Sequence, residues 1–202
     1  MRSWKSLFLV TVMLLLVPAA AFANGGWQVD VRGGMALPMG DYGDAFKSGL
    51  LIGMDASHMM TPMLAIGVDG NYIKNSPTDD SQTALDATFG AGTDAEAKFV
   101  HYGAHVKYML GTKGSKAIPY MVGGVGLYNA KFGITPPGGP EVSDSETKFG
   151  LRGGVGANFM VGTSWGIGVQ ADFHDVMTSG QSSQFIGLAA GLHFNLTPAS
   201  HQ

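Results

Sequence analysis

Apolar residues recur at every second position near the end of the chain, over residues 185–196, with small or polar residues between them. A period of two is typical of a β-strand that has one apolar face. The alternation outlasts the five or six residues usual in soluble strands. It covers the 9–11 residues that a strand needs to cross a membrane. The pattern therefore predicts a transmembrane strand.

Seven earlier runs alternate in the same way, and each predicts another strand. They cover residues 27–36, 49–60, 63–74, 97–110, 117–132, 146–161 and 165–174. The run 117–132 is ambiguous because both of its faces carry apolar residues, and we assign Tyr120, Val122 and Tyr128 to its outward face. Unpaired backbone groups cost several kcal/mol each in hydrocarbon, and a closed barrel leaves no unpaired edge. We therefore predict an all-β fold, an eight-stranded antiparallel up-and-down transmembrane β-barrel.

The connections between these runs alternate in length. Three are short, at 61–62, 111–116 and 162–164, whereas four are long, at 37–48, 75–96, 133–145 and 175–183. Outer-membrane barrels have short periplasmic turns and longer outer loops. The alternation predicts that all long loops lie on the outer side.

Aromatic residues near the strand ends form two predicted girdles, as expected where amphipathic rings sit at the level of the lipid headgroups. The girdle at the short turns comprises Trp27, Tyr108, Tyr120, Phe159, Trp165 and Phe194. The girdle at the long loops comprises Tyr72, Tyr102, Tyr128, Phe149 and Phe173.

The N-terminus has the features of a cleaved signal peptide. Arg2 and Lys5 precede an apolar run over 7–17, and Ala21-Phe22-Ala23 is a cleavage motif. We predict a signal peptide over 1–23, a barrel over 24–196 and a short periplasmic tail over 197–202. An uncleaved anchor is the alternative, but the run is too short to span as a helix.

Composition narrows the possible functions. The chain has no Cys, which excludes a disulfide framework. Its formal net charge of −3 argues against nucleic acid as a partner. Only 13% of residues are charged, about half the share in an ordinary soluble domain.

Several charged residues fall on the predicted inward faces. Buried charges must be paired, and this set carries both signs, so we predict an interior polar network. Its members are Asp30, Arg32, Asp55, Asp69, His101, Lys107, Arg152 and Asp172. A metal site is the alternative, but His101 and His105 stand about 13 Å apart along one strand, too far to share an ion.

Two motifs hint at other chemistry. Gly162-Thr163-Ser164-Trp165-Gly166 matches the nucleophile elbow, which requires a strand before it and a helix after it. Here the motif lies in a turn between two predicted strands. Gly-Gly-Val-Gly occurs at 123–126 and 153–156, but no predicted helix follows to hold a phosphate. We predict no catalytic, cofactor-binding or metal-binding residues.

The long loops are acidic. We expect a solvated surface there, and a cation-bridged contact with lipopolysaccharide is the weaker alternative. The residues are Asp79, Asp80, Asp86, Asp94, Glu96, Glu141, Asp144 and Glu146.

Two stretches resemble the small outer-membrane β-barrel family, which includes the OmpA-like, OmpX-like and OmpW-like barrels and is often called porin-like. Residues 36–49 resemble the family's first loop. Gly191, Phe194 and Leu196 at alternate outward positions resemble its C-terminal assembly signal, although this signal ends in Leu196 and not in an aromatic residue. The resemblance implies a bacterial outer-membrane location, insertion by the barrel assembly machinery, and outer-membrane lipids and lipopolysaccharide as neighbours. We expect a monomer.

We therefore expect a non-enzymatic protein of structural or interaction type whose outer loops form the contact surface, with no cofactor. Three alternatives remain. The barrel could be a channel for small solutes or hydrophobic molecules, or a lipid-modifying enzyme, for which His174 is the only weak candidate residue. It could also be a soluble lipocalin-type barrel with its apolar face inward.

Overall fold

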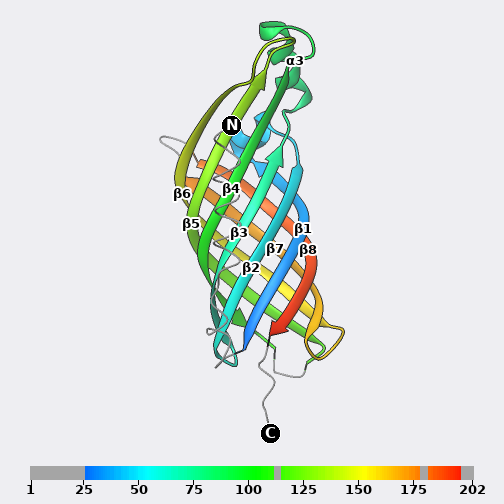
Figure 1. Ribbon diagram of the computed structural model, residues 1–202, viewed down its shortest axis with the longest axis vertical. Coiled ribbons are helices and arrows are strands. Elements are labelled where there is room, and N and C mark those ends of the chain that lie inside the picture. The colour runs from blue at the N-terminus through cyan, green and yellow to red at the C-terminus, as the bar shows by residue number, and fades with distance from the viewer. Residues whose placement is uncertain (1–25, 112–114, 178–181, 197–202) are drawn as a thin grey trace.

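A closed barrel of eight strands forms the body of the protein in the computed structural model, which describes residues 26–111, 115–177 and 182–196 (Figure 1). The strands are β1 (Trp27–Met39), β2 (Gly49–Thr61), β3 (Leu64–Asn75), β4 (Asp94–Met109), β5 (Ala117–Thr135), β6 (Val142–Met160), β7 (Trp165–Met177) and β8 (Ser182–Leu196). The predicted signal peptide and periplasmic tail lie outside the described residues.

Every strand pairs antiparallel with its neighbour in sequence, and β1 pairs with β8 to close the sheet. At the seam, Trp27 stands opposite Leu196 and Val29 opposite Phe194. In the body of the barrel, each strand therefore has hydrogen-bonded partners on both sides, whereas the outer ends of β4 and β6, over 94–96 and 142–149, pair on one side only. The predicted eight-stranded up-and-down barrel is confirmed. In the described parts of the chain, no helix has the length and apolar character to cross a membrane.

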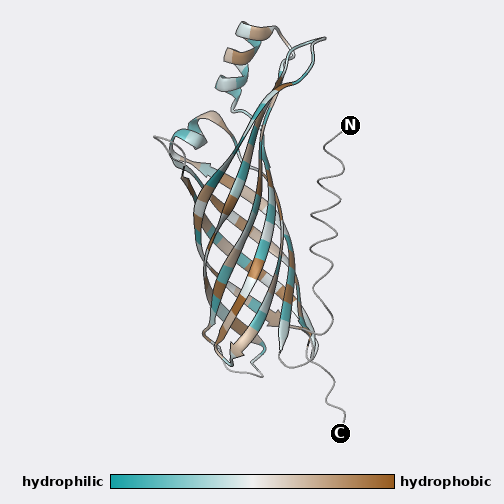
Figure 2. Ribbon diagram, turned by 60° about the vertical axis from the view of Figure 1, so that its left-hand side comes forward, coloured by the Kyte–Doolittle hydropathy of each residue, from teal (hydrophilic) through white to brown (hydrophobic). Residues whose placement is uncertain are grey.

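The outer wall of the barrel is apolar, and polar residues point into the lumen. On β7, Ile167 and Val169 are 46% and 40% exposed, whereas Gln170, the next residue, is 4% exposed. Figure 2 shows the resulting alternation of apolar and polar residues along the strands. The lipocalin-type alternative, with the apolar face inward, is therefore wrong.

β4, β5 and β6 extend three or four residues beyond their predicted outer ends. β4 begins at Asp94. β5 continues to Thr135 and β6 starts at Val142, so the predicted long loop between β5 and β6 is reduced to 136–141. Figure 1 shows these strands rising above the rest of the barrel at the long-loop end. They form a wall on one side of the barrel mouth.

Two short helices lie in loops for which the sequence reading gave no helix. Helix α2 (Gly40–Ala45) follows β1, and α3 (Asp79–Phe89) follows β3. The hydroxyl of Thr78 caps α3 by accepting a hydrogen bond from Ser81 N, and Gly90 ends it at a φ of 107°. Thr78 followed by two Asp residues in the first turn is a helix-start signal that could have been read from the sequence.

Strand β5 faces the opposite way from our prediction. Tyr120, Val122 and Tyr128 are 1%, 5% and 0% exposed, so they point into the lumen. The outward residues of this strand are Met121, Val125 and Leu127. Tyr120 and Tyr128 are therefore not girdle residues, and that part of the girdle prediction is wrong.

The glycines of β6 explain the orientation of β5. Gly156 pairs with Tyr120 in the register, and a Cβ on Gly156 would come within 2.4 Å of Tyr120 Cζ. A Cβ on Gly150 would come within 2.6 Å of Tyr128 Cε2. Each tyrosine ring thus lies over a strand position that has no side chain, an arrangement known to support glycine in sheets. The crowded inner face accepts two large rings because β6 gives them room.

Replacing Gly156 by Ala should destabilise the barrel, because the new methyl group overlaps the Tyr120 ring. Overpacking of this kind costs about 1–3 kcal/mol. The matched control is Gly153→Ala on the same strand, where an added Cβ meets nothing within 4 Å. Urea unfolding in phospholipid vesicles measures both variants. Equal unfolding midpoints for the two variants would contradict the packing argument.

Candidate functional site

The lumen is filled by three layers of side chains. An apolar layer lies near the long loops, a polar layer lies in the middle, and a smaller apolar layer lies near the short turns. The lower layer contains Ala65, Met109, Tyr120 and Val122, with Met59 and Ile118 packed against it. The upper layer contains Ala36, Tyr42, Leu51, Ile73, Ala97, Phe99, Tyr128, Ala130, Val176 and Phe185.

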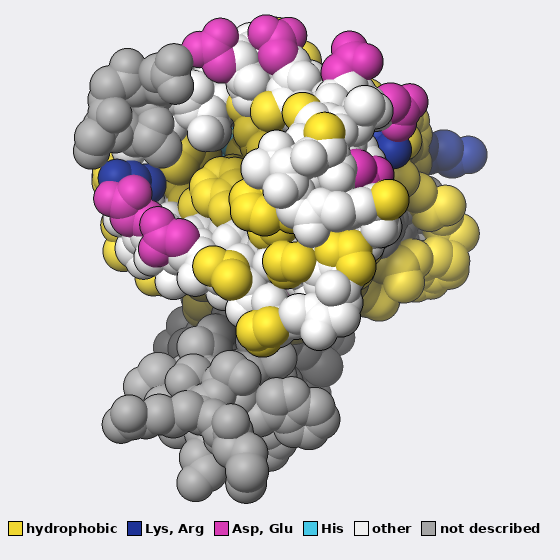
Figure 3. Space-filling view, turned by 90° about the horizontal axis from the view of Figure 1, so that it is seen from above, with side chains coloured by type: hydrophobic (Ala, Val, Ile, Leu, Met, Phe, Trp, Pro, Cys, Tyr) yellow, Lys and Arg dark blue, Asp and Glu magenta, His cyan; other side chains and the backbone are white. Residues whose placement is uncertain are grey.

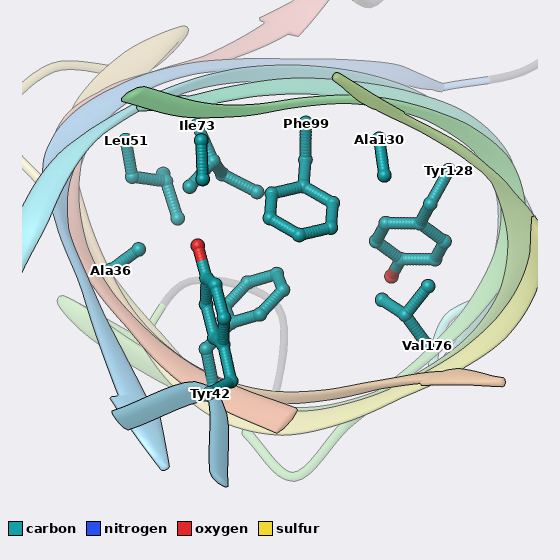
Figure 4. Packing of buried hydrophobic residues seen from close by; sticks show 10 residues of the cluster. Ala36, Tyr42, Leu51, Ile73, Phe99, Tyr128, Ala130 and Val176 are labelled. Carbon is teal, nitrogen blue, oxygen red and sulfur yellow. The ribbon is translucent and has the colours of Figure 1, made fainter. Parts of the chain in front are cut away.

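Tyr42 from α2 reaches down into the barrel mouth and completes the upper layer (Figure 4). Its ring packs edge-on against Phe99, with centroids 5.5 Å apart, and its hydroxyl donates a 3.0 Å hydrogen bond to Asn75 Oδ1. Burial raises the pKa of the Tyr42 phenol above its ordinary value, so the group remains a neutral donor. The first outer loop thereby closes the lumen from above.

Lys107 is the centre of the polar layer. Its ammonium group donates to Asp30 Oδ2 at 2.7 Å and to Asp55 Oδ1 at 2.5 Å. Arg32 Nη2 lies 2.7 Å from the other Asp55 oxygen. His193 Nδ1 lies 2.8 Å from Asp30 Oδ1. Two carboxylates and two cations therefore neutralise one another across the barrel.

Asp69 joins the two histidines of β4. Its Oδ2 lies 3.1 Å from His101 Nδ1, and its Oδ1 lies 2.9 Å from His105 Nδ1. The 3.3 Å contact of Arg152 Nη2 with Asp69 Oδ1 links this group to Asp172, 3.9 Å from Arg152 Nη1. A carboxylate thus occupies the space between the two imidazoles.

All eight residues of the predicted interior network are buried, none more than 8% exposed, and ion pairs or hydrogen bonds connect them in the lumen. The sequence reading left other members of this layer out of the network. They share its inward parity on their strands, which is the signal that could have included them. They are Ser57, Asn71, His105, Asn158, Gln170, His174 and His193.

Ser57, His105 and Asp69 are arranged like the serine, histidine and aspartate of a hydrolytic triad. Ser57 Oγ lies 2.9 Å from His105 Nε2, and His105 Nδ1 lies 2.9 Å from Asp69. A triad acts only when a substrate carbonyl reaches the serine beside oxyanion donors. Ser57 is 0% exposed in the middle of the filled lumen. The geometry therefore serves the hydrogen-bond network and gives no access for a substrate.

The other candidate serine lies outside the lumen. Ser164 is in the turn between β6 and β7, and β7 begins at the next residue. The strand-to-helix context of a nucleophile elbow is absent at this position. His174 is also buried in the lumen: it is 1% exposed, and its Nδ1 lies 2.8 Å from the Tyr128 hydroxyl.

Most acidic residues of the outer loops have partners within the protein. Glu96 Oε2 lies 2.8 Å from Lys74 Nζ, and the same carboxylate pairs with Lys98. Glu141 Oε1 accepts from Lys131 at 2.7 Å. Over the described ranges, no group of three or more His, Cys, Asp or Glu side chains is arranged to hold a metal ion.

The lysines of these pairs form a row. Lys74, Lys98 and Lys131 are register partners on β3, β4 and β5. They lie two positions beyond the row of Tyr72 and Val100, on the side of the outer loops. The two glutamates, Glu96 and Glu141, only partly balance the charge of the three lysines.

The remaining girdle residues differ in exposure. The clearly exposed rings are Tyr102, Tyr108, Phe149, Phe159, Trp165 and Phe173, whereas Trp27, Tyr72 and Phe194 are half-buried. In the predicted assembly signal, Leu196 is 43% exposed and Phe194 half-buried. Gly191 pairs with the buried Arg32, so it lies on the inward parity, and its placement as an outward position is wrong.

Replacing Lys107 by Met should strongly destabilise the barrel, because it leaves Asp30 and Asp55 buried without their shared cation. Breaking a buried ion pair costs about 3–5 kcal/mol. The control is Lys131→Met, which removes a half-exposed pair worth about 0–1 kcal/mol. Unfolding by urea in vesicles compares the two. A loss below about 1 kcal/mol for Lys107→Met would show that the network does not depend on this residue.

Solved structures with the same architecture cover nearly the whole barrel. Neisserial surface protein A is 20% identical, with a TM-score of 0.60, over 85% of this chain and 99% of that chain. A major outer membrane protein from Thermus thermophilus is 13% identical, with a TM-score of 0.61, over 84% and 99%. Ail from Yersinia pestis, solved with the heparin analogue sucrose octasulfate, is 15% identical, with a TM-score of 0.52, over 84% and 99%.

At these identities the likeness concerns the fold alone. No curated protein matches the chain. The family model described as "Outer membrane protein beta-barrel domain" matches residues 9–196. The chain therefore belongs to the outer membrane protein beta-barrel domain family and is a protein of the bacterial outer membrane.

Proposed function

We propose that this protein is a non-enzymatic, non-conducting barrel that holds its outer loops as a contact surface. The observation that carries this proposal is the filled lumen. Eight strands leave an interior just wide enough for side chains to fill. Here two apolar layers enclose a polar layer, and all three consist of buried residues.

Charged groups in the lumen have almost no contact with solvent. Lys107 is 0% exposed, Asp30 1% and Arg32 4%. In a water-filled pore, charged side chains would line the water and remain exposed, as they do in porins. The interior therefore serves stability, and the outer end is the part of the molecule that is free to make contacts.

The outer loops are tied to one another by backbone bonds. Lys47 N donates to Ser76 O at 3.0 Å, and Thr78 N donates to Ala45 O at 3.0 Å. An isolated β-bridge joins Phe46 to Pro77 between the same two loops. Loops held in place by a rigid scaffold are where binding surfaces usually lie. Figure 3 shows the outer end, with hydrophobic side chains near its middle and carboxylates along its edge.

Lipids and lipopolysaccharide are the partners that the wall of the barrel favours. The row of Lys74, Lys98 and Lys131 stands where anionic headgroups begin, beyond the exposed aromatic residues. Phe194 and Leu196 in β8 fit the role of a signal read by the barrel assembly machinery. Since β1 pairs with β8, the closed part of the barrel leaves no sheet edge in the membrane for pairing with a second copy, which favours a monomer.

Planar bilayers containing the purified protein should show no stepwise conductance, because all three layers block the lumen. The positive control is an open trimeric porin in the same bilayer. Phe99→Ala, which thins only the upper layer, should also conduct nothing, because the ion-paired middle layer remains. Reproducible unit conductance steps from the wild-type barrel would contradict the proposal.

The proposed absence of enzymatic activity has its own test. Overexpression should leave the mass spectrum of lipid A unchanged, because Ser57, the serine with a histidine beside it, is buried in the lumen. A strain that overproduces Ser57→Ala is the control. A loss or gain of acyl chains that depends on Ser57 would contradict a purely structural role for the triad-like group.

A further inference from the structure

Helix α3 does not pack closely against the extended strands beside it. A surface helix normally buries an apolar stripe, yet none of the residues of α3 is buried. Its Ala84 and Leu85 line an open pocket. These two apolar side chains therefore face a space that the protein does not fill.

The pocket between α3 and the extended outer ends of β4 and β5 has a volume of about 460 Å³, within the range of roughly 300–1,000 Å³ found for small-molecule sites. Three parts of the chain supply its apolar walls. They are Phe46 and Pro77 from the tied loops, Ala84 and Leu85 from α3, and Phe132 and Ile134 from β5.

The polar side chains of the lining are engaged within the protein. Ser81 Oγ accepts from Thr78 at 3.0 Å, and the Thr88 hydroxyl donates to Ala84 O at 2.8 Å. The Glu96 carboxylate pairs with Lys74 and Lys98. The pocket therefore presents neutralised charge and apolar walls, and a complementary occupant is uncharged and apolar.

The position of the pocket sets the side from which an occupant arrives. Leu127 pairs with the exposed girdle residue Tyr102, and Ile134 lies roughly 20 Å further along β5 at the usual rise per residue. At a strand tilt of about 35–45°, this distance corresponds to a height of roughly 15 Å above Tyr102. We place Tyr102 at the level of the headgroups, so Ile134 lies beyond the acyl chains. The Phe46 and Phe132 rings, 6.0 Å apart, and the Phe99 ring, 6.1 Å from Phe132, separate the pocket from the lumen.

We propose that this pocket binds an uncharged, apolar small molecule from the outer side of the membrane. The site is independent of conduction, because it ends on the upper apolar layer. The barrel then acts as a support that holds a binding site above the membrane. The pocket is a separate site from the contact surface proposed above, and each of the two proposals has its own test.

Naphthalene is a suitable probe, and 2-naphthoate is its charged counterpart. Methyl NMR of the protein in zwitterionic phospholipid nanodiscs should show saturable shifts at Leu85 and Ile134 on addition of naphthalene. The lipid-facing Val125 reports partition into the bilayer and should show no saturation. We expect 2-naphthoate to bind at least about tenfold more weakly, because a charged group loses its hydration in an apolar pocket.

Two variants of α3 separate binding in the pocket from general effects. Ala84→Trp fills the pocket and should abolish the saturable shift of Ile134. Ala87→Trp places the same ring at an exposed position of the same helix that does not line the pocket, and should leave the shift unchanged.

Three results would overturn the inference. They are the lack of saturation at Leu85 and Ile134 in the wild type, an unchanged shift in Ala84→Trp, and equal binding of the charged probe. None of them bears on whether the lumen conducts, which the bilayer measurement decides.

Discussion

The need to pair every backbone N–H and C=O group in hydrocarbon determines the rest of this structure. No water is present there to satisfy an open sheet edge, so β1 must meet β8. Closure with eight strands fixes a narrow lumen. Because that lumen is too narrow for a water column and too wide to be left empty, the inward side chains must fill it. The packing of Tyr120 and Tyr128 over Gly156 and Gly150 is a direct consequence of this constraint.

The polar layer follows from the same geometry. Charges that point inward cannot reach water, and a buried charge is tolerated only with a partner. Lys107 satisfies this requirement by pairing with Asp30 and Asp55 at once. Asp69 does so by lying 3.3 Å from Arg152 Nη2, with His101 and His105 on either side of its carboxylate. A set of residues that could suggest a metal site or a catalytic triad is therefore explained by charge balance. The apolar layers above and below exclude water and strengthen these contacts.

The sequence predicted the architecture because a period of two records which face of a strand meets lipid. The outward Ile167 and Val169 and the inward Asp30 and Lys107 could all be placed from parity alone. Parity did not give the orientation of β5, because both faces of that strand are apolar. The orientation depends on the glycines of the neighbouring strand β6. A non-local fact of this kind appears only once the register of β5 and β6 is known. The pocket beneath α3 depends on tertiary contacts between loops, which no periodicity encodes, although the Thr78 cap could have revealed the helix.

Hydrogen bonds, and not apolar packing, hold α3 in place. Gln82 Nε2 donates to Thr93 O at 2.6 Å, and Asp86 accepts from Thr93 N at 3.1 Å. These bonds anchor the helix to the start of β4 while its apolar side faces Phe132 and Ile134 across the pocket. If packing alone fixed the helix, the gap would close and the pocket would vanish. A helix held by its hydrogen bonds can keep an apolar surface open, which is the arrangement that a binding site for an apolar molecule requires.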